Sequence, residues 1–506
     1  MMVTDGHSLR QGYFDSMFVN ILTAMAHEPE PPVIVVGAGP VGLAAAAHLA
    51  DRRLPFLLLE AGDTAGNSVR EWGHVQLFSP WQYNVDGAAR RLLGAEGWPE
   101  PDADELPTGT DLLKRYLLPL AESPVIAPYI RYGTTVEAIS RLDVDRMRTV
   151  GREKVPFVVR LADGEEVLAQ AVIDASGTWR TPNMLGANGL PARGEAAAAS
   201  RIFNAMPDVL GTERDRFAGR HTVVVGAGHS AATTLLALAD LAKAEPETRI
   251  TWAIRAADPT RAFGGESDDE LPARGLLGSG LHMLIDSGRV TLVPNFRTHT
   301  VELRDDGVEL FSRPGQSLLC DQVVAATGYR PDHSIASELR LDLDPILSAP
   351  RPVAPLIDPN DHACGTVRPH GYRELAQPEP GYFIVGMKSY GRAPTFLMAT
   401  GYEQVRSIVA SLAGDLEAAA SVELVLPETG VCSAVAGAEA LAQRMGISPE
   451  LHTSLLHATA RHLGRSPSAA AAVMAAAAEL GVDESVALQL AAYAADRFDV
   501  PGTNSC

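Results

Sequence analysis

The sequence is poor in cysteine, and its few cysteines are far apart. The four are Cys320, Cys364, Cys432 and Cys506, without CxxC or CxxxxC spacing. A disulfide framework and a zinc knuckle both need closely spaced cysteines, so we expect neither of them and predict no metal site. The same distribution favours a reducing compartment, and we expect a cytoplasmic protein.

Positive charge and long apolar runs are scarce as well. Lys plus Arg number 42 against 62 Asp plus Glu, which gives a net charge of −20. This balance argues against nucleic acid and against an anionic membrane surface as partners, because both are themselves negatively charged. No apolar run is long enough to span a bilayer, and the N-terminal stretch lacks the pattern of a signal peptide.

A buried strand, a glycine turn and a helix are predicted in "VIVVGAGPVGLAAAAHLADRR". In the turn, Gly37 permits a sharp bend, Gly39 lets the backbone approach a pyrophosphate, and Gly42 lets the helix pack close to the sheet. The helix begins near Pro40, and its free N–H groups favour phosphate. Glu60 ends the next predicted strand, where it could bind both ribose hydroxyls and disfavour a 2′-phosphate. We therefore predict a dinucleotide site.

The same order restarts at "HTVVVGAGHSAATTLLALAD". Small residues again form the turn and the start of the helix: Gly226, Gly228, Ser230 and Ala231. After the following strand, "TWAIRAADPTR" places Arg255 and Arg261 where the first unit has a glutamate. A guanidinium can bind a 2′-phosphate through two hydrogen bonds, so the second site is expected to prefer NADPH over NADH. Alternatively, both arginines are solvated surface charges.

The order of strands and helices predicts an α/β protein with two nested, doubly wound Rossmann-like domains and a C-terminal helical extension. We expect "FVVRLADGEEVLAQAVIDASG" to form a hairpin that leads into a buried strand. The expected divisions are an arm at 1–30, a first nucleotide domain at 31–190 and 336–426, a second at 191–335, and the extension at 427–506.

Four motifs together resemble the flavin-containing (class B type) monooxygenases among the pyridine nucleotide-dependent flavoprotein oxidoreductases. They are "GAGPVG", "GAGHSA", "IDASGTWRTPN" and "AATGYRPD". The resemblance implies FAD at the first turn and NADPH at the second, with Gly177 and Gly328 closing the strands that link the two folds near the cofactors. In one respect the chain departs from the family, because "ARGEAAAASRIFNAMPDV" lacks the Phe-x-Gly-x-x-x-His signature of animal-type and Baeyer–Villiger enzymes.

The resemblance also implies individual site residues. Asn84 falls where such enzymes keep an amide near the reactive face of the flavin, and Arg392 precedes a helix whose N-terminus would favour a negative flavin edge. Lys388 follows the late flavin-domain turn and fits a solvated loop charge. Further flavin contacts are expected from Arg70, Trp72, Gln76 and Gly386, and the alternative for Trp72 is a core aromatic.

Three functions remain open at this stage. In the first, NADPH reduces FAD, O₂ forms a C4a-hydroperoxyflavin, and a heteroatom or carbonyl of a small-molecule substrate is oxygenated. In the second, an NADPH-dependent reductase acts on a disulfide or metalloid through Cys364 and Cys432, whereas buried inert thiols are the alternative for this pair. In the third, a flavin redox sensor contacts a partner through the helical extension, which is also compatible with a homodimer interface.

Overall fold

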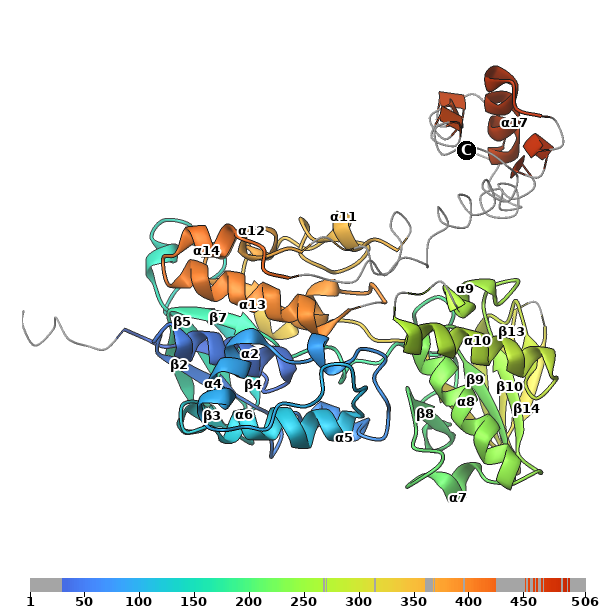
Figure 1. The fold of residues 1–506 in the computed structure, drawn as a ribbon, viewed down its shortest axis with the longest axis horizontal. Helices are drawn as coiled ribbons and strands as arrows, with labels where there is room; N and C mark the ends of the chain where they lie inside the picture. The colour runs from blue at the N-terminus through green and yellow to red at the C-terminus, as the bar shows by residue number, and fades with distance from the viewer. Residues whose placement is uncertain are drawn as a thin grey trace, which may run out of the picture.

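The computed structural model describes residues 30–424 with few gaps, and only parts of 451–491 beyond them. The gaps are residues 267–268, 270, 314, 360–366, 368 and 395. Two five-stranded sheets form separate α/β domains, which lie side by side in Figure 1. The α/β class predicted from the sequence, with parallel sheets, is confirmed.

The first sheet is entirely parallel and has the strand order β16-β7-β1-β2-β3. All four residues of β1 are buried, because strands lie on both sides of it, helices cover one face of the sheet, and an antiparallel sheet within residues 136–169 covers the other. Helix α2 (Pro40–Asp51), which is rich in alanine, packs along α13 (Met398–Leu412), and α13 is buried from Ala399 to Ala410. The strands are β1 (Val33–Val36), β2 (Phe56–Leu59), β3 (Ile130–Arg131), β7 (Ala171–Asp174) and β16 (Tyr382–Ile384).

A three-stranded antiparallel sheet precedes β7 along the chain. It contains β4 (Val136–Arg141), β5 (Phe157–Leu161) and β6 (Glu166–Ala169). The hairpin predicted at residues 157–169 is confirmed by the pairing of β5 with β6.

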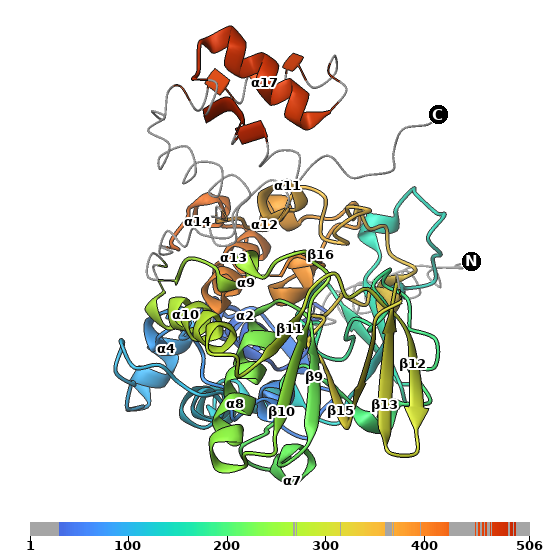
Figure 2. The same cartoon turned by 90° about the vertical axis from the view of Figure 1, so that its right-hand side faces the viewer.

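The second parallel sheet has the order β11-β10-β9-β15-β8. Helix α8 (His229–Ala244) follows β9 and packs against α10 (Pro272–Asp286). Figure 2 shows β9, β10, β11 and β15 of this sheet beside β12 (Thr298–Arg304) and β13 (Gly307–Ser312), which form an antiparallel sheet with β14 (Ser317–Cys320). The parallel strands are β8 (Ile202–Asn204), β9 (His221–Val225), β10 (Arg249–Ala253), β11 (Thr291–Val293) and β15 (Gln322–Ala325).

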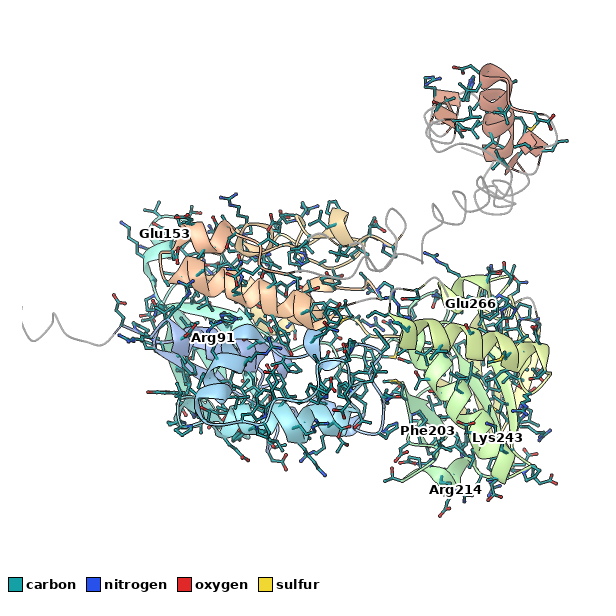
Figure 3. All side chains as sticks on the ribbon, viewed as in Figure 1. Arg91, Glu153, Phe203, Arg214, Lys243 and Glu266 are labelled. Atoms are coloured by element: carbon teal, nitrogen blue, oxygen red, sulfur yellow. The ribbon has the colours of Figure 1, made fainter. Side chains whose placement is uncertain are left out.

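Short helices fill the remaining connections. In the first domain they are α3 (Asn67–Glu71), α4 (Gly87–Ala95), α5 (Gly109–Leu112), α6 (Leu118–Glu122), α11 (Ala354–Ile357), α12 (Tyr372–Leu375) and α14 (Leu416–Ala420). In the second they are α7 (Arg214–Phe217) and α9 (Thr260–Phe263). Charged side chains on the outer surface, such as Arg91 on α4, Arg214 on α7 and Lys243 on α8 in Figure 3, form exposed ion pairs that contribute little to stability.

The described part of the C-terminal region is helical. Helix α17 (Ala469–Leu480) begins at Ser468, whose side chain accepts a hydrogen bond from the backbone of Ala471. It shares a small apolar cluster with described neighbours such as Leu455 and Leu490. Among the described residues, no helix is both long enough and apolar enough to cross a bilayer.

The chain crosses between the two parallel sheets twice, first after β7 and again after β15. The two crossings pair with each other, since the amide of Asn183 donates to the carbonyl of Gly328 at 2.9 Å and that of Arg330 to Thr181 at 3.0 Å. The rings of Trp179 and Tyr329, one from each crossing, stack with centroids 5.0 Å apart. The connection between the domains therefore consists of two segments of the chain that pair with each other.

Candidate functional site

The first glycine turn lies between β1 and α2, at the carboxyl edge of the first sheet. Gly37 has φ +98°, and a Cβ there would lie 2.8 Å from the carbonyl oxygen of Ala175, which follows β7. A Cβ at Gly42 would overlap the carbonyl oxygen of Gly37, so the helix and the turn are packed too closely for a side chain. A Cβ at Gly39 would meet no atom within 4 Å. The backbone at Gly39 is thus open to an approaching phosphate.

Glu60 lies at the carboxyl end of β2, beside this turn. Its two carboxylate oxygens accept hydrogen bonds from the amides of Ala38 and Gly62, both at 2.7 Å. The carboxylate therefore holds the first turn in shape, and each oxygen has further lone pairs for a ligand hydroxyl. Its predicted contact with a ribose stays a prediction.

The second glycine turn lies between β9 and α8 and repeats this geometry. Gly226 has φ +134°, and a Cβ there would overlap the carbonyl oxygen of Ala326, at the end of β15. Gly228 again has open space around it. Ala231 is fully buried in the first turn of α8, whose following residues pack on the sheet. The small residues thus serve the packing that a third glycine serves in the first turn.

His229 and Phe78 bring the two domains together at the second turn. His229 is the first residue of α8, and its ring lies 5.3 Å from the ring of Phe78, which belongs to the first domain. Burial lowers the pKa of His229, and the nearby Arg274 lowers it further, so the imidazole is neutral at pH 7. Neither residue was predicted as a site residue, although "GAGHSA" shows the histidine directly after the second glycine.

The segment that contains Phe78 also contacts the first turn. The amide of Gly66, just before α3, donates to the carbonyl of Ala38 at 2.9 Å. At the other end of α3, Glu71 accepts hydrogen bonds from Trp179 Nε1 at 2.8 Å and from Arg180 on the first crossing. A continuous segment, residues 66–78, therefore joins the first turn, the bridge between the domains and the second turn.

The arginines predicted to select the coenzyme lie beyond β10. Arg255 Nη1 donates to the carbonyl of Ala187 at 3.3 Å, and Arg261 Nη2 donates to that of Pro359 at 3.0 Å. Both side chains are exposed. Because each guanidinium has five N–H donors, these contacts leave donors for an anionic ligand.

The predicted flavin contacts of the first domain lie on or after α3. Arg70 forms an ion pair with Asp63 at 2.9 Å, Trp72 is half-buried, and Gln76 is exposed and forms an isolated antiparallel bridge with Thr108. These side chains come from the segment that joins the two turns, and their contact with a flavin stays a prediction.

Asn84 is fully buried, and its amide is used within its own loop. It donates to the carbonyls of Ser79 and Pro80 at 2.6 and 3.1 Å, and it accepts from Ser79 Oγ at 2.9 Å. Both amide protons are therefore engaged in holding this loop. Arg392 is exposed and lies between the 3₁₀ segment η8 (Gly386–Tyr390) and α13. The catalytic roles of both residues stay predictions.

Cys320 is the one cysteine within the described residues, on β14. Burial raises the pKa of its thiol to about 12, and the thiol donates to the carbonyl of Val308. It is therefore an inert core residue. Cys364 and Cys432, on which the reductase hypothesis depends, lie outside the described residues, as does Cys506. Within the described ranges, no three His, Cys, Asp or Glu side chains gather in a way that could hold a metal ion.

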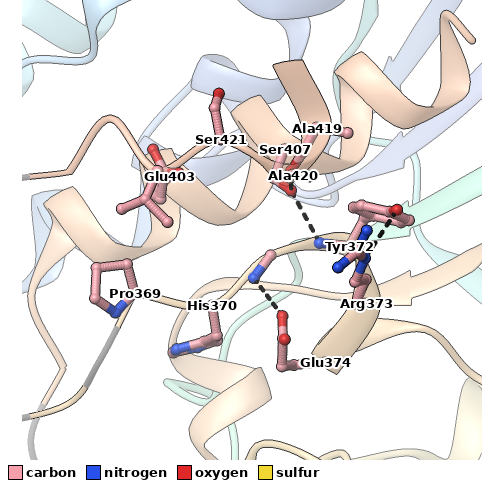
Figure 4. A pocket seen from close by; sticks show the side chains of 12 residues that line it. Pro369, His370, Tyr372, Arg373, Glu374, Glu403, Ser407, Ala419, Ala420 and Ser421 are labelled. Carbon is pink, nitrogen blue, oxygen red and sulfur yellow. Dashed lines mark hydrogen bonds between the residues drawn. The ribbon is translucent and has the colours of Figure 1, made fainter. Parts of the chain in front are cut away.

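A small cavity lies between α12, α13 and α14 (Figure 4). Polar groups on its wall already bind one another: the amide of Tyr372 donates to Ser407 Oγ at 3.0 Å and that of Gly371 to Glu374 at 2.9 Å. Its volume of about 100 Å³ is below the range of cofactor pockets. It is not a dinucleotide site.

Comparison with known proteins agrees with the two-turn architecture. A protein-family profile described as "Pyridine nucleotide-disulphide oxidoreductase" matches residues 34–347, which is more than half of the chain. The indole-3-pyruvate monooxygenase YUCCA1 of Oryza sativa subsp. japonica is 29% identical over 202 residues, which span 40% of this chain and 43% of that protein.

Two solved structures show the same fold. The bacillithiol disulfide reductase of Bacillus cereus has a TM-score of 0.55 and 18% identity, covering 76% of this chain and 99% of that one. The FAD-bound cadaverine monooxygenase DfoA of Erwinia amylovora has a TM-score of 0.54 and 15% identity, covering 79% of this chain and 98% of that one. At these identities the similarity establishes the fold alone.

Proposed function

We propose that this chain, which belongs to the pyridine nucleotide-disulphide oxidoreductase family, is an oxidoreductase that uses FAD at its first glycine turn and NADPH at its second. Both turns fit a pyrophosphate. Each has a backbone position open to approach, Gly39 in one and Gly228 in the other, directly before a helix N-terminus. A helix N-terminus with free N–H groups and partial positive charge favours such an anion.

The observation that carries the proposal is the contact between Phe78 and His229, with ring centroids 5.3 Å apart. Transfer of a hydride needs the nicotinamide and the flavin to meet in one space. Residues 66–78 contact the first turn at Ala38 and the second turn at His229. This chain of contacts between the two turns supports the proposal that they serve one shared space.

The charge around each turn supports the assignment of the two nucleotides. Glu60 stands beside the first turn, where its negative charge would repel a 2′-phosphate. Arg255 and Arg261 follow β10 of the second domain, where guanidinium groups would attract one. FAD has no 2′-phosphate and NADPH has one, so the charges match FAD at the first turn and NADPH at the second.

Among the reactions open to such a protein, we favour oxygenation of a heteroatom or carbonyl of a small molecule with O₂. A bound flavin reduced by NADPH supplies this chemistry, so the chain need not provide an acid–base pair. The role of the protein is to bind and orient both cofactors and to exclude water. Partial identity to a monooxygenase, YUCCA1, is consistent with this choice. A reductase that works through Cys364 and Cys432 is the alternative that the experiment must distinguish.

The test begins with the purified full-length protein. We expect it to be yellow, and we expect NADPH to bleach it under anaerobic conditions much faster than NADH does. Rapid mixing of the reduced protein with O₂ should then give biphasic reoxidation. Monophasic reoxidation together with turnover accelerated by a disulfide would support the reductase instead. A colourless protein that acquires no flavin on reconstitution would refute the assignment of the first turn.

A further inference from the structure

A buried cluster of charged and polar side chains lies at the carboxyl end of β7, next to the first turn. Lys388 Nζ donates to Asp174 Oδ2 at 2.7 Å and to Ser176 Oγ at 3.0 Å. Tyr382 donates its hydroxyl proton to the same carboxylate at 2.8 Å, and Ser176 Oγ donates to Asp174 Oδ1 at 2.6 Å. The ion pair is fully buried, since the Lys388 side chain is 2% exposed and that of Asp174 is 0% exposed. Lys388 is thus not the solvated loop charge that the sequence suggested.

The position of this cluster in the sheet connects it to the cofactor. Strand β1 lies between β7 and β2, so the crevice at the carboxyl edge between β1 and β7 is where the connections leave in opposite directions, the usual ligand site of such sheets. Asp174 is the last residue of β7, and the adjacent Ala175 touches the first turn at Gly37. Ser176 is exposed at this edge. The cluster therefore lies at the carboxyl edge of the sheet, next to the first turn.

The two members of the ion pair are not equally satisfied. Asp174 accepts four hydrogen bonds, from Lys388, Tyr382, and the hydroxyl and the backbone amide of Ser176. Lys388 has three N–H groups, and the contacts to Asp174 and Ser176 account for two of them. Burial alone would raise the pKa of Asp174, but the charge and hydrogen bond of Lys388, together with the hydrogen bonds from Ser176 and Tyr382, hold it lowered, so the carboxyl group is ionised. The positive member is the one with a donor to spare.

We propose that Lys388 is a positioning residue that presents a buried positive charge to the flavin site and so favours the reduced, negatively charged flavin over the oxidised one. This inference rests on the proposed binding of FAD at the first turn. Asp174 orients the ammonium through the ion pair, and Ser176, which accepts a hydrogen bond from Lys388, is exposed at the carboxyl edge of the sheet. Asp332 and His333, on the chain leaving the second domain, are described titratable groups that also interact electrostatically with Lys388.

The test compares the two-electron reduction potential of the bound flavin in the wild type with that in charge variants. Lys388→Met leaves the carboxylate unneutralised, so the preference for reduced flavin should fall about tenfold, which corresponds to about 30 mV. Asp174→Asn leaves the ammonium unneutralised and should shift the potential in the opposite direction. A purely structural role would not give shifts of opposite sign.

Two further variants keep the test decisive if a single change prevents folding. The double variant Asp174→Asn/Lys388→Met lacks both charges of this pair, and its flavin potential should still be lower than that of the wild type. The variant Lys388→Arg keeps the positive charge and should keep the wild-type potential. Glu403→Gln/Arg406→Met is the matched control, because it removes another buried ion pair, at 2.7 Å on the face of α13 toward α14, and should leave the potential unchanged.

Thermal unfolding and flavin content, measured for each variant, separate the possible failures. A wild-type potential in Lys388→Met or in the double variant, with flavin bound, would overturn the role of Lys388 and leave the proposed function standing. A wild-type protein that binds no flavin would overturn the proposed function itself.

Discussion

The substitutions Gly39→Ala and Gly228→Ala should each weaken the binding of a cofactor without impairing folding. Gly39 has φ −77° and ψ −175°, and Gly228 has φ −95° and ψ −177°, which are conformations that alanine adopts without strain. At both positions an added Cβ meets no atom within 4 Å. The methyl group would instead occupy the space through which we expect a pyrophosphate to approach. The variants should therefore fold normally and lose one cofactor each.

The expected magnitudes follow from these local geometries. Replacing glycine by alanine before a helix costs about 1 kcal/mol, and the reduced freedom of the unfolded chain returns about 0.4–1 kcal/mol. The melting temperature should therefore move by only about 2 °C. Forcing a methyl group against a bound phosphate costs about 1–3 kcal/mol, which corresponds to about 5- to 150-fold weaker binding. The effect on binding should thus far exceed the effect on stability.

The assay measures three quantities for each variant: the melting temperature, the flavin content from absorbance, and the Kd for NADPH from titration of the protein. Gly39→Ala should lose flavin and keep NADPH binding, whereas Gly228→Ala should keep flavin and lose NADPH binding. Each variant is the control for the other. If Gly228→Ala bound NADPH as tightly as the wild type, the second turn would not be the phosphate site.

Three other outcomes are expected. Gly42→Ala should lower the free energy of unfolding by about 1–3 kcal/mol in chemical denaturation, because its Cβ overlaps the backbone of the turn, and an unchanged stability would contradict the close packing seen there. Glu379→Gln should cost about 3–5 kcal/mol at pH 7, because it leaves two buried arginines without their carboxylate. Burial alone would raise the pKa of Glu379, but those arginines hold it lowered. The ionised carboxylate therefore stabilises the folded protein above pH 4.5, and this stabilisation is lost as the pH falls further. The stability difference between wild type and variant should therefore shrink in acid, which denaturation curves at several pH values would show. Arg255→Ala/Arg261→Ala should raise the KM for NADPH about 10- to 100-fold while leaving that for NADH nearly unchanged, and equal changes for both coenzymes would refute the 2′-phosphate role.

The parts of the fold that could be predicted from the sequence are those governed by local constraints. The strands that precede the glycine turns are short, and they are apolar throughout in β1 and over the last three residues of β9, because helices or other strands cover them on both faces. The glycines at Gly37 and Gly226 are required by the backbone itself, since each has a positive φ and lies against a carbonyl oxygen. Such constraints determine the residue types within a short stretch of sequence, where they can be recognised.

The contacts that could not be predicted join residues far apart in the chain. Asp174 and Lys388 are 214 positions apart, and only the pairing of β7 with β16 brings them together. Phe78 and His229 meet because the two domains are packed against each other, which no periodicity in either segment indicates. An isolated lysine in a loop is usually solvated, so the burial of Lys388 depends on a partner that the local sequence does not reveal.

The paired crossings at Asn183 and Gly328 have a consequence for how the chain can be rearranged. Because the chain enters and leaves the second domain at adjacent points, the intervening residues form a cassette whose two ends already touch. The first sheet is completed by β7 before the cassette and β16 after it, and these two strands pair directly. Insertions are tolerated where their ends meet at a surface. Exchange of this cassette for one from another protein of the same fold should therefore replace the proposed NADPH site while leaving the proposed FAD-binding domain intact.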